Sequence, residues 1–493
     1  MESATYKLFT TKHKDYEAIK TSSEFMDASY AGGSRYVKKN IFQYLNESDL
    51  KYRDRIKRAF VVNYISTLVD EIKNTIFSRN IQRDSATSST IEGKKFKRFI
   101  DNATYNNKSL DYFMKNVATM GAYERIGILL EGVAPEEVAR LGINPASVSS
   151  QVKEKYNLYP RLKIFTPEKI LNWSVTDKIN WVLLDYSYDD DSDFENPKKV
   201  KKHVLWTSDY FRVVIFAEGG YEIASDETFI HNLGRIPFWF FTQRDIDDNT
   251  TSETLYEDIA LQQRAICGYY SIIDESIYSS IFSILLVENS DEYPELNESP
   301  KMRKEPFTLD KNVLSYAKGT SAPSLLKTDF ANIPIVLSLI DGLIKEINRK
   351  VGKYLDPNNY FAQSGLAKLV DQEQRAINIV NYAKQLQDLE NSILQVYSLY
   401  EGIAWNEYYM SVYPQDFRSI DVKDKIANAI QLKNIFAARS ETAERIILKD
   451  IFLKLYSENI TEQEKEAIIK EIEGSYQSDI DLNFETEPDN QTT

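Results

Sequence analysis

Residues 334–405 read PIVLSLIDGLIKEINRKVGKYLDPNNYFAQSGLAKLVDQEQRAINIVNYAKQLQDLENSILQVYSLYEGIAW, and this stretch decides the fold of the chain. It holds two segments with apolar side chains at helical spacing, separated by the break DPNN at 356–359. The apolar positions before the break define one broad helical face, which we expect to be buried: Ile335, Val336, Leu339, Ile340, Leu343, Ile344, Ile347 and Val351. The apolar positions after the break are Leu366, Val370, Ile377, Val380, Leu389, Ile393, Val396, Tyr400 and Ile403.

The segment after the break predicts a very long helix. No proline occurs between Leu366 and Pro414, so a helix that ran unbroken to Ser411 would measure about 70 Å at 1.5 Å per residue. That length exceeds the width of an ordinary domain core. Ser364 stands just before the helix and can cap its free amides. We therefore expect a helix that braces a large structure.

Composition and charge limit the classes of protein that fit. The chain has 493 residues, enough for two to four lobes of roughly 150 residues each, and its 32 Tyr and 24 Phe suit extensive packing or subunit contacts. The formal net charge of −14 opposes wrapping of a DNA duplex around the outside, so any contact with DNA would need a local basic surface.

Cysteine content and hydropathy indicate a cytoplasmic setting. Cys267 is the only cysteine, which excludes an intrachain disulfide framework and suits a reducing compartment. The sequence has no run of about 18 apolar residues and no apolar signal segment near Met1. It therefore predicts neither a Sec signal nor a membrane span.

The first third of the chain reads as helical in two places. Residues 49–77 carry apolar side chains at helical spacing with a basic first half, and the plain interpretation is one amphipathic helix with a solvated Arg/Lys face. A second helix is predicted over Leu110–Met120, leading through Gly121 into a short apolar strand at 125–130.

Residues 161–245 change to the pattern of short strands separated by turns, which predicts an antiparallel sheet. The strand runs are Leu162–Phe165, Trp181–Leu184, Val204–Trp206 and Arg212–Phe216.

The region ends in HNLGRIPF at 231–238, followed by an aromatic run. Gly234 permits a turn with positive φ, and Pro237 favours an extended entry into that run. We expect His231 to be a hydrogen-bonded turn residue, because no acid or nucleophile is patterned around it.

The order of these segments resembles the portal proteins of tailed bacteriophages, the connectors between head and tail. Four stretches carry the resemblance: YRDRIKRAFVVN at 52–63, FTPEKILNW at 165–173, HNLGRIP at 231–237 and SGLA at 364–367. It implies a predominantly helical α+β subunit that assembles into a ring. The implied regions are a wing (1–245, N-terminal helices and antiparallel sheet), a stem helix (246–286), a clip (287–330), a second stem helix (331–355), a tunnel loop (356–365), a long wing helix with following helices (366–445), a crown (446–475) and a disordered acidic tail (476–493).

The resemblance also implies a function. A ring of roughly twelve subunits would stand at one capsid vertex and pass double-stranded DNA through its axis without sequence specificity, during packaging and during ejection. Its implied partners are the major capsid protein, a scaffolding protein, the large terminase and head-completion or adaptor proteins. The resemblance implies a structural protein without enzymatic activity, cofactor or membrane contact, located in the virion and, during assembly, in the host cytoplasm.

Two neighbouring segments are candidates for facing the DNA. By resemblance the loop 356–365 lines the tunnel, and before it Lys345, Arg349 and Lys353 recur every four residues on one helical face. In a ring each position would become a circle of charge that holds phosphates loosely. The alternative is a basic helix end that complements the helix dipole. The candidate tunnel residues are Lys345, Arg349, Lys350, Lys353, Asn358, Asn359, Tyr360, Phe361 and Gln363.

The search for catalytic chemistry leaves two alternatives open. The sequence contains no nucleotide-binding glycine motif, and its three histidines are widely spaced. DDDSD at 189–193 imitates the start of a calcium loop, but Phe194 and Val200 occupy its glycine and final glutamate positions, so a solvated hairpin tip is preferred over a metal site. The alternatives to a portal are a helical scaffold or adaptor acting as a monomer or dimer, and a metal-dependent α+β enzyme that uses this cluster.

Overall fold

The computed structural model divides into two compact units, Met1–Phe417 and Arg418–Thr493. The structure describes residues 4–45, 47–83, 90–133, 138, 142, 150–156, 158–192, 198–217, 219, 222–243, 256–281, 285–288, 313–316, 332–350, 365–406, 409–415, 417 and 468–470. The predicted crown and acidic tail therefore lie outside the described residues, apart from 468–470.

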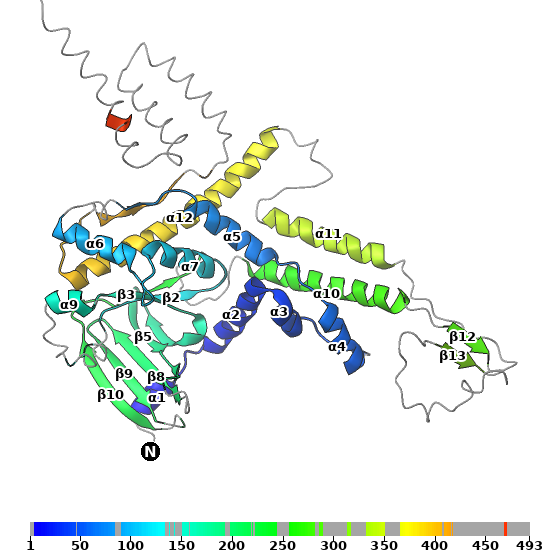
Figure 1. The fold of residues 1–493 in the computed structure, drawn as a ribbon, viewed down its shortest axis with the longest axis horizontal. Coiled ribbons are helices and arrows are strands. Elements are labelled where there is room, and N and C mark those ends of the chain that lie inside the picture. The colour runs from blue at the N-terminus through cyan, green and yellow to red at the C-terminus, as the bar shows by residue number, and fades with distance from the viewer. Residues whose placement is uncertain are drawn as a thin grey trace, which may run out of the picture. The chain divides into compact units, whose positions relative to one another are not determined.

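The first unit mixes helices with largely antiparallel sheets, which confirms an α+β fold at that level. Its larger sheet has five antiparallel strands in the order β10-β9-β8-β5-β4 (Figure 1). Large side chains such as Trp173, Val182 and Trp206 form a core on one face. The strands are β4 (Ile170–Val175), β5 (Ile179–Asp185), β8 (Lys202–Thr207), β9 (Tyr210–Phe216) and β10 (Ile223–Ile230).

A second sheet corrects the expectation of one sheet over 161–245. Its three antiparallel strands are β11 (Phe238–Phe241), β2 (Ile126–Glu131) and β3 (Arg161–Phe165), in that order. The central strand β2 is buried along almost its whole length, so both of its edges need a partner strand. Gly127 lets an aromatic ring cross this strand, because a Cβ at that position would lie 2.5 Å from Cζ of Phe238.

The main hydrophobic core joins this sheet to a helical layer. Tyr382 is buried in the core and donates a hydrogen bond from its hydroxyl to the carbonyl oxygen of Ala118 at 2.7 Å. Gly121 was expected at a turn but lies inside a helix, where its missing side chain makes room for the Phe241 ring. The helices of this layer are α2 (Tyr16–Ala31), α5 (Tyr64–Phe77), α6 (Ile91–Asp101), α7 (Leu110–Tyr123) and α12 (Gly365–Glu401).

The long helix α12 begins where expected but ends earlier. It has 37 residues, or about 55 Å, and stops at Glu401 rather than continuing to Ser411. Gly402 follows with a φ of 65°, the left-handed conformation that commonly ends helices. The chain then turns back, and β14 (Ser411–Val412) pairs with β1 (Gln82–Arg83).

The N-terminal segment is helical. Helix α1 (Ala4–Thr10) covers the second face of the five-stranded sheet, where Phe9 packs with Val214 and Phe216. His203 on β8 makes a hydrogen bond from Nδ1 to the carbonyl oxygen of Phe9 at 2.7 Å. Further short elements are α3 (Gly33–Asn40), α9 (Ser150–Tyr156) and the 3-10 turn η3 (Pro167–Lys169).

The single helix expected over residues 49–77 is two helices, α4 (Asp49–Arg58) and α5. The chain leaves the helical conformation at Ala59, and Asn63 starts the second helix by accepting a hydrogen bond from the Ser66 amide at 3.0 Å. The asparagine cap is the local reason for the break.

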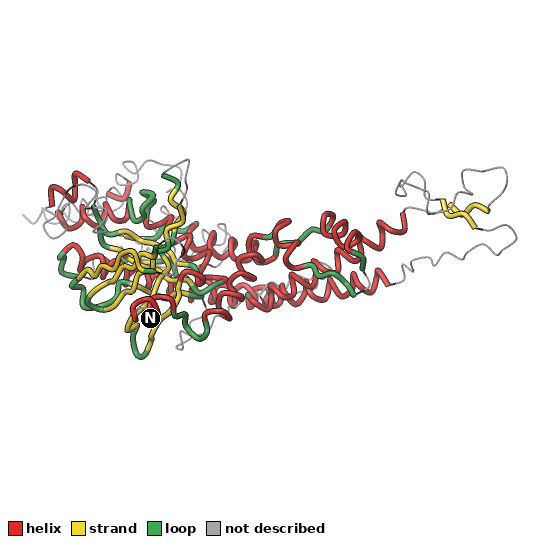
Figure 2. The backbone as a smooth tube through the Cα atoms, turned by 90° about the horizontal axis from the view of Figure 1, so that it is seen from below, coloured by secondary structure: helices red, strands yellow, loops and turns green. Residues whose placement is uncertain are grey.

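Two antiparallel helices, α10 (Glu257–Ile281) and α11 (Ile333–Lys350), run side by side (Figure 2). They correspond to the described parts of the two predicted stem helices. Between them in the chain, β12 (Leu285–Glu288) and β13 (Val313–Tyr316) form a parallel pair.

None of the helices that the structure describes is both long enough and apolar enough to cross a bilayer.

Candidate interaction surface on the helical arm

The arm consists of α4, α10 and α11. The end of α11 is joined to the start of α10, because Lys350 Nζ lies 2.9 Å from Asp258 Oδ2. Ile340 and Ile347 of α11 are buried and belong to the same core cluster as Ile259 of α10. One side of α11 is therefore fixed to α10 by apolar packing and an ion pair.

Charged side chains hold α4 against α10. The guanidinium of Arg55 is buried and donates to both carboxylate oxygens of Glu47, at 2.7 and 2.6 Å, and to Ser271 Oγ of α10 at 3.0 Å. Arg58 forms ion pairs with Asp274, at 2.9 Å, and with Glu275. These contacts use the polar side of α4 for attachment to α10.

The predicted apolar face of α11 is only partly covered within the chain. Ile335 and Leu339, which we expected to be buried, are 59% and 52% exposed. The expectation was wrong for these positions because α10 covers only the side of α11 that carries Ile340 and Ile347. We call Ile335 and Leu339, which are four residues apart and share one side of the helix, the α11 face.

A second group of exposed apolar residues lies in the first turn of α4 and on the segments that enter and leave this helix. Phe42 is 64% exposed, Leu50 is 74% exposed, and Leu45 and Phe60 are exposed as well. We call Phe42, Leu45, Leu50 and Phe60 the α4 face. This face was not predicted from the sequence, although Leu45 and Leu50 are apolar residues within the polar stretch QYLNESDL and so indicate an exposed apolar site.

The two faces belong to helices on different sides of α10. Figure 1 shows α11 above α10 and α4 below it. Groups of large apolar side chains that a single chain leaves in water commonly mark protein interfaces. The arm therefore carries two separate apolar surfaces that the described residues of one copy do not cover.

The structure describes only some of the predicted tunnel residues. Lys345 is exposed, and no carboxylate partner for it occurs among the described residues. Arg349 donates to both carboxylate oxygens of Glu346, at 2.9 and 2.6 Å, which lowers the pKa of Glu346, and Lys350 pairs with Asp258. Lys353, Asn358, Asn359, Tyr360, Phe361 and Gln363 lie outside the described residues.

The structure answers two smaller questions from the sequence. His231 is a hydrogen-bonded turn residue as predicted: Nε2 lies 3.0 Å from the carbonyl oxygen of Thr207, and Nδ1 accepts from the Leu233 amide.

The carboxylates at 189–191 belong to a hairpin of β6 (Tyr188–Asp190) and β7 (Lys198–Val200). No cluster of carboxylate, histidine and cysteine groups with the geometry of a metal site occurs in the described part of the chain.

Comparison with known proteins gave no relative. No family model matches the chain, and a search of curated proteins found no match.

Proposed function

We propose that this chain is a portal-type subunit that assembles head to tail through the arm into a closed ring, and that the ring passes double-stranded DNA at one capsid vertex. One observation carries the proposal: the α11 face and the α4 face are both exposed, and they belong to helices on different sides of α10.

Two different surfaces on one subunit favour a particular kind of assembly. If the α11 face of one copy covers the α4 face of the next, the contact is heterologous, and repeating it produces a ring when the rotation closes. Burying a Leu, Ile or Phe side chain contributes about 1.5–3 kcal/mol before association costs, so the six residues of the two faces are enough to contribute substantially. The order of segments in the sequence, with its resemblance to portal proteins, supports a ring of roughly twelve copies.

Within the proposed ring the end of α11 and the following loop face the channel. Exposed lysines and arginines there would hold phosphates by charge alone, which permits the duplex to slide without sequence preference. Terminase, head-completion proteins, scaffold and major capsid protein would dock on the outside. The subunit itself would be a structural protein and not an enzyme.

The experiment tests whether the two faces meet each other. One variant carries Leu45→Lys and Leu50→Lys on the α4 face, and a second carries Ile335→Lys and Leu339→Lys on the α11 face. The control is Ile230→Lys, which adds a lysine at an exposed apolar residue of β10 outside the arm. Mass photometry and negative-stain imaging measure assembly, and circular dichroism checks that each variant is folded.

A heterologous contact gives a distinctive pattern of results. The unchanged chain, of 57.0 kDa, and the control should form rings, with 12 × 57.0 = 684 kDa for twelve copies, whereas each arm variant alone should stay monomeric. When the two arm variants are mixed, one intact face remains on each, so they should form a heterodimer and stop there. An unchanged chain that stays monomeric or dimeric at micromolar concentration supports a scaffold or adaptor and contradicts the proposal. Homodimers of either arm variant would contradict the head-to-tail contact.

A further inference from the structure

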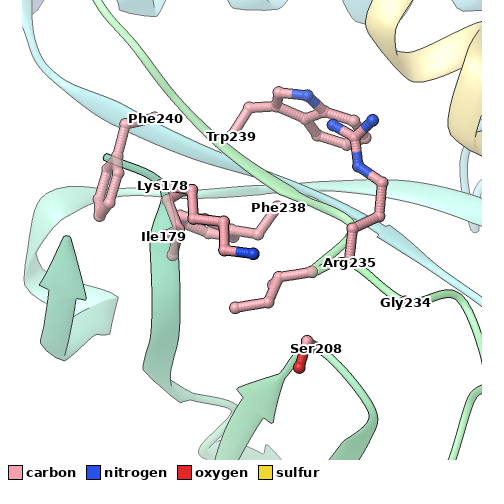
Figure 3. Close-up of a pocket in the computed structure, with 9 residues that line it drawn as sticks. Lys178, Ile179, Ser208, Gly234, Arg235, Phe238, Trp239 and Phe240 are labelled. Carbon is pink, nitrogen blue, oxygen red and sulfur yellow. The ribbon is translucent and has the colours of Figure 1, made fainter. Parts of the chain in front are cut away.

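A pocket of about 520 Å³ opens on the surface where two turns of the five-stranded sheet meet the segment that enters β11 (Figure 3). Lys178 comes from the β4–β5 turn, Ile179 begins β5, and Ser208 comes from the β8–β9 turn. The remaining wall is formed by residues 234–236 and 238–240. The volume lies within the range of pockets that hold a small organic group. The pocket is remote in sequence from the arm, and the proposed ring does not use it.

The inner wall of the pocket is apolar and aromatic. Phe238 is buried and packs edge to face against Phe240, with 5.0 Å between the ring centroids. The indole Nε1 of Trp239 donates to Ser392 Oγ at 2.8 Å, so the polar edge of this ring already has its partner. Ile179 adds an aliphatic surface. This wall suits an apolar or aromatic side chain.

The rim of the pocket carries two cations. Lys178 and Arg235 are both exposed, and neither side chain has a hydrogen bond or ion pair within the described part of the chain. Figure 3 shows the Lys178 ammonium on the pocket side of its turn and the Arg235 side chain extended along Trp239. The Ser208 hydroxyl donates to Asp209 Oδ2 at 2.9 Å, so the two cations are the groups of this rim that can bind a carboxylate, which ammonium and guanidinium groups do through charge-assisted hydrogen bonds.

Neighbouring charges distinguish a single carboxylate from a nucleic acid. Asp177 and Asp209 are exposed and directly adjacent in the chain to Lys178 and Ser208. These carboxylates would repel the successive phosphates of a polyanion, whereas a single carboxylate can bind to Lys178 or to Arg235. The surroundings therefore favour a ligand with few negative charges next to an apolar group.

The backbone beside the pocket suits an extended chain. Three lining residues, Phe238, Trp239 and Phe240, belong to β11, which is the outer strand of its sheet and pairs only with β2 among the described strands. An outer strand can add an extended peptide through main-chain hydrogen bonds, while pockets select its side chains. Gly234, with a φ of 66° and open space where a Cβ would be, keeps the entrance clear.

We propose that this pocket binds an extended acidic segment of a partner protein, with an apolar or aromatic side chain of that segment against Phe238 and Trp239 and neighbouring carboxylates at Lys178 and at Arg235. The inference does not depend on the oligomeric state of the chain.

The test uses the full-length protein and a fluorescein-labelled heptapeptide in which Glu and Phe alternate. Two comparison peptides replace either every Glu by Gln or every Phe by Ala. The binding variant carries Lys178→Gln and Arg235→Gln. The matched control carries Lys38→Gln and Lys39→Gln, which removes the same charge from exposed lysines of α3. Fluorescence anisotropy gives the affinity.

We expect the Glu/Phe peptide to bind, the binding variant to weaken it at least tenfold, and the control to change it less than twofold. Both comparison peptides should bind at least tenfold more weakly than the Glu/Phe peptide. Equal weakening by the control would show that only overall charge matters and would overturn the site. If the peptide does not bind at millimolar concentration, the proposed ligand is wrong. It is also wrong if inorganic phosphate or a single-stranded oligonucleotide displaces the labelled peptide at a lower concentration than the unlabelled peptide does.

Discussion

Replacing Glu124 by Gln should make the protein more stable above neutral pH and change its dependence on pH. Glu124 follows the last residue of α7, is 3% exposed and accepts a hydrogen bond from Ser23 Oγ at 2.6 Å. Burial raises the pKa of Glu124 from 4.5 to about 7; the negative charges of Asp27 and Glu168 add to the rise, and the Ser23 hydrogen bond opposes it. A glutamine has nearly the same shape and can still accept the Ser23 hydrogen bond.

The sign follows from the higher pKa in the folded state. Between pH 4.5 and 7 the folded chain keeps a proton that the unfolded chain has lost, so the free energy of unfolding falls as the pH rises. Above pH 7 the full penalty is present: 7 − 4.5 = 2.5 units, at 1.36 kcal/mol each, is about 3 kcal/mol. Glu124→Gln removes this penalty. The variant should therefore exceed the unchanged protein in stability by up to about 3 kcal/mol at pH 8, and by much less near pH 5.

Urea unfolding at pH 5, 6, 7 and 8 measures this difference, at one fixed protein concentration because assembly would add to the apparent stability. Glu227→Gln on the exposed side of β10 is the matched control, and it should leave the pH dependence unchanged. A difference between variant and parent that is the same at all four pH values, or a variant less stable than its parent at pH 8, would refute the reasoning.

Two further predictions concern ion pairs and basic residues. Arg83 donates to both oxygens of the fully buried Glu390, at 2.7 and 3.0 Å. Arg83→Met should therefore lower the free energy of unfolding in urea by about 3–5 kcal/mol, and adding Glu390→Leu should recover part of this loss. Unchanged stability of the Arg83→Met variant would contradict the prediction. In the proposed ring, replacing Lys345, Arg349 and Lys353 together by Gln should leave assembly intact but shorten or release the packaged DNA. Lower stability without a change in packaging would instead support the helix-dipole interpretation. No effect on either would contradict the DNA-facing and the helix-dipole interpretations alike.

Local sequence signals predicted most of the elements. The apolar spacing located α10, α11 and the start of α12, and the β-type runs located β3, β5, β8 and β9. The errors at element ends were also local in origin. Asn63 and Gly402 are an ordinary helix cap and an ordinary helix stop, and both were overlooked within longer periodic runs.

The pairing of the strands could not be predicted in the same way. Strand β2 takes partners from residues 161–165 and 238–241, and nothing in the sequence of Ile126–Glu131 specifies which distant run will lie beside it. Periodicity likewise shows that one face of α11 is apolar without showing what covers it. Ile347 and Leu339 belong to the same predicted stripe, yet one packs on α10 and the other remains exposed, because coverage depends on tertiary position.

The ion pairs of α11 indicate which basic side chains are available to a phosphate. Lys350 bridges two helices through Asp258, so a phosphate that recruited it would have to break a contact that helps to hold the arm together. The pair of Arg349 with Glu346 lies within one helix on an exposed surface, where water and salt screen it, and a phosphate can compete for the guanidinium. Lys345 has no such competitor among the described residues. Lys345 is therefore a described position at which a channel could attract DNA without breaking an ion pair of the arm, and substitutions that spare Lys350 separate DNA binding from the integrity of the arm.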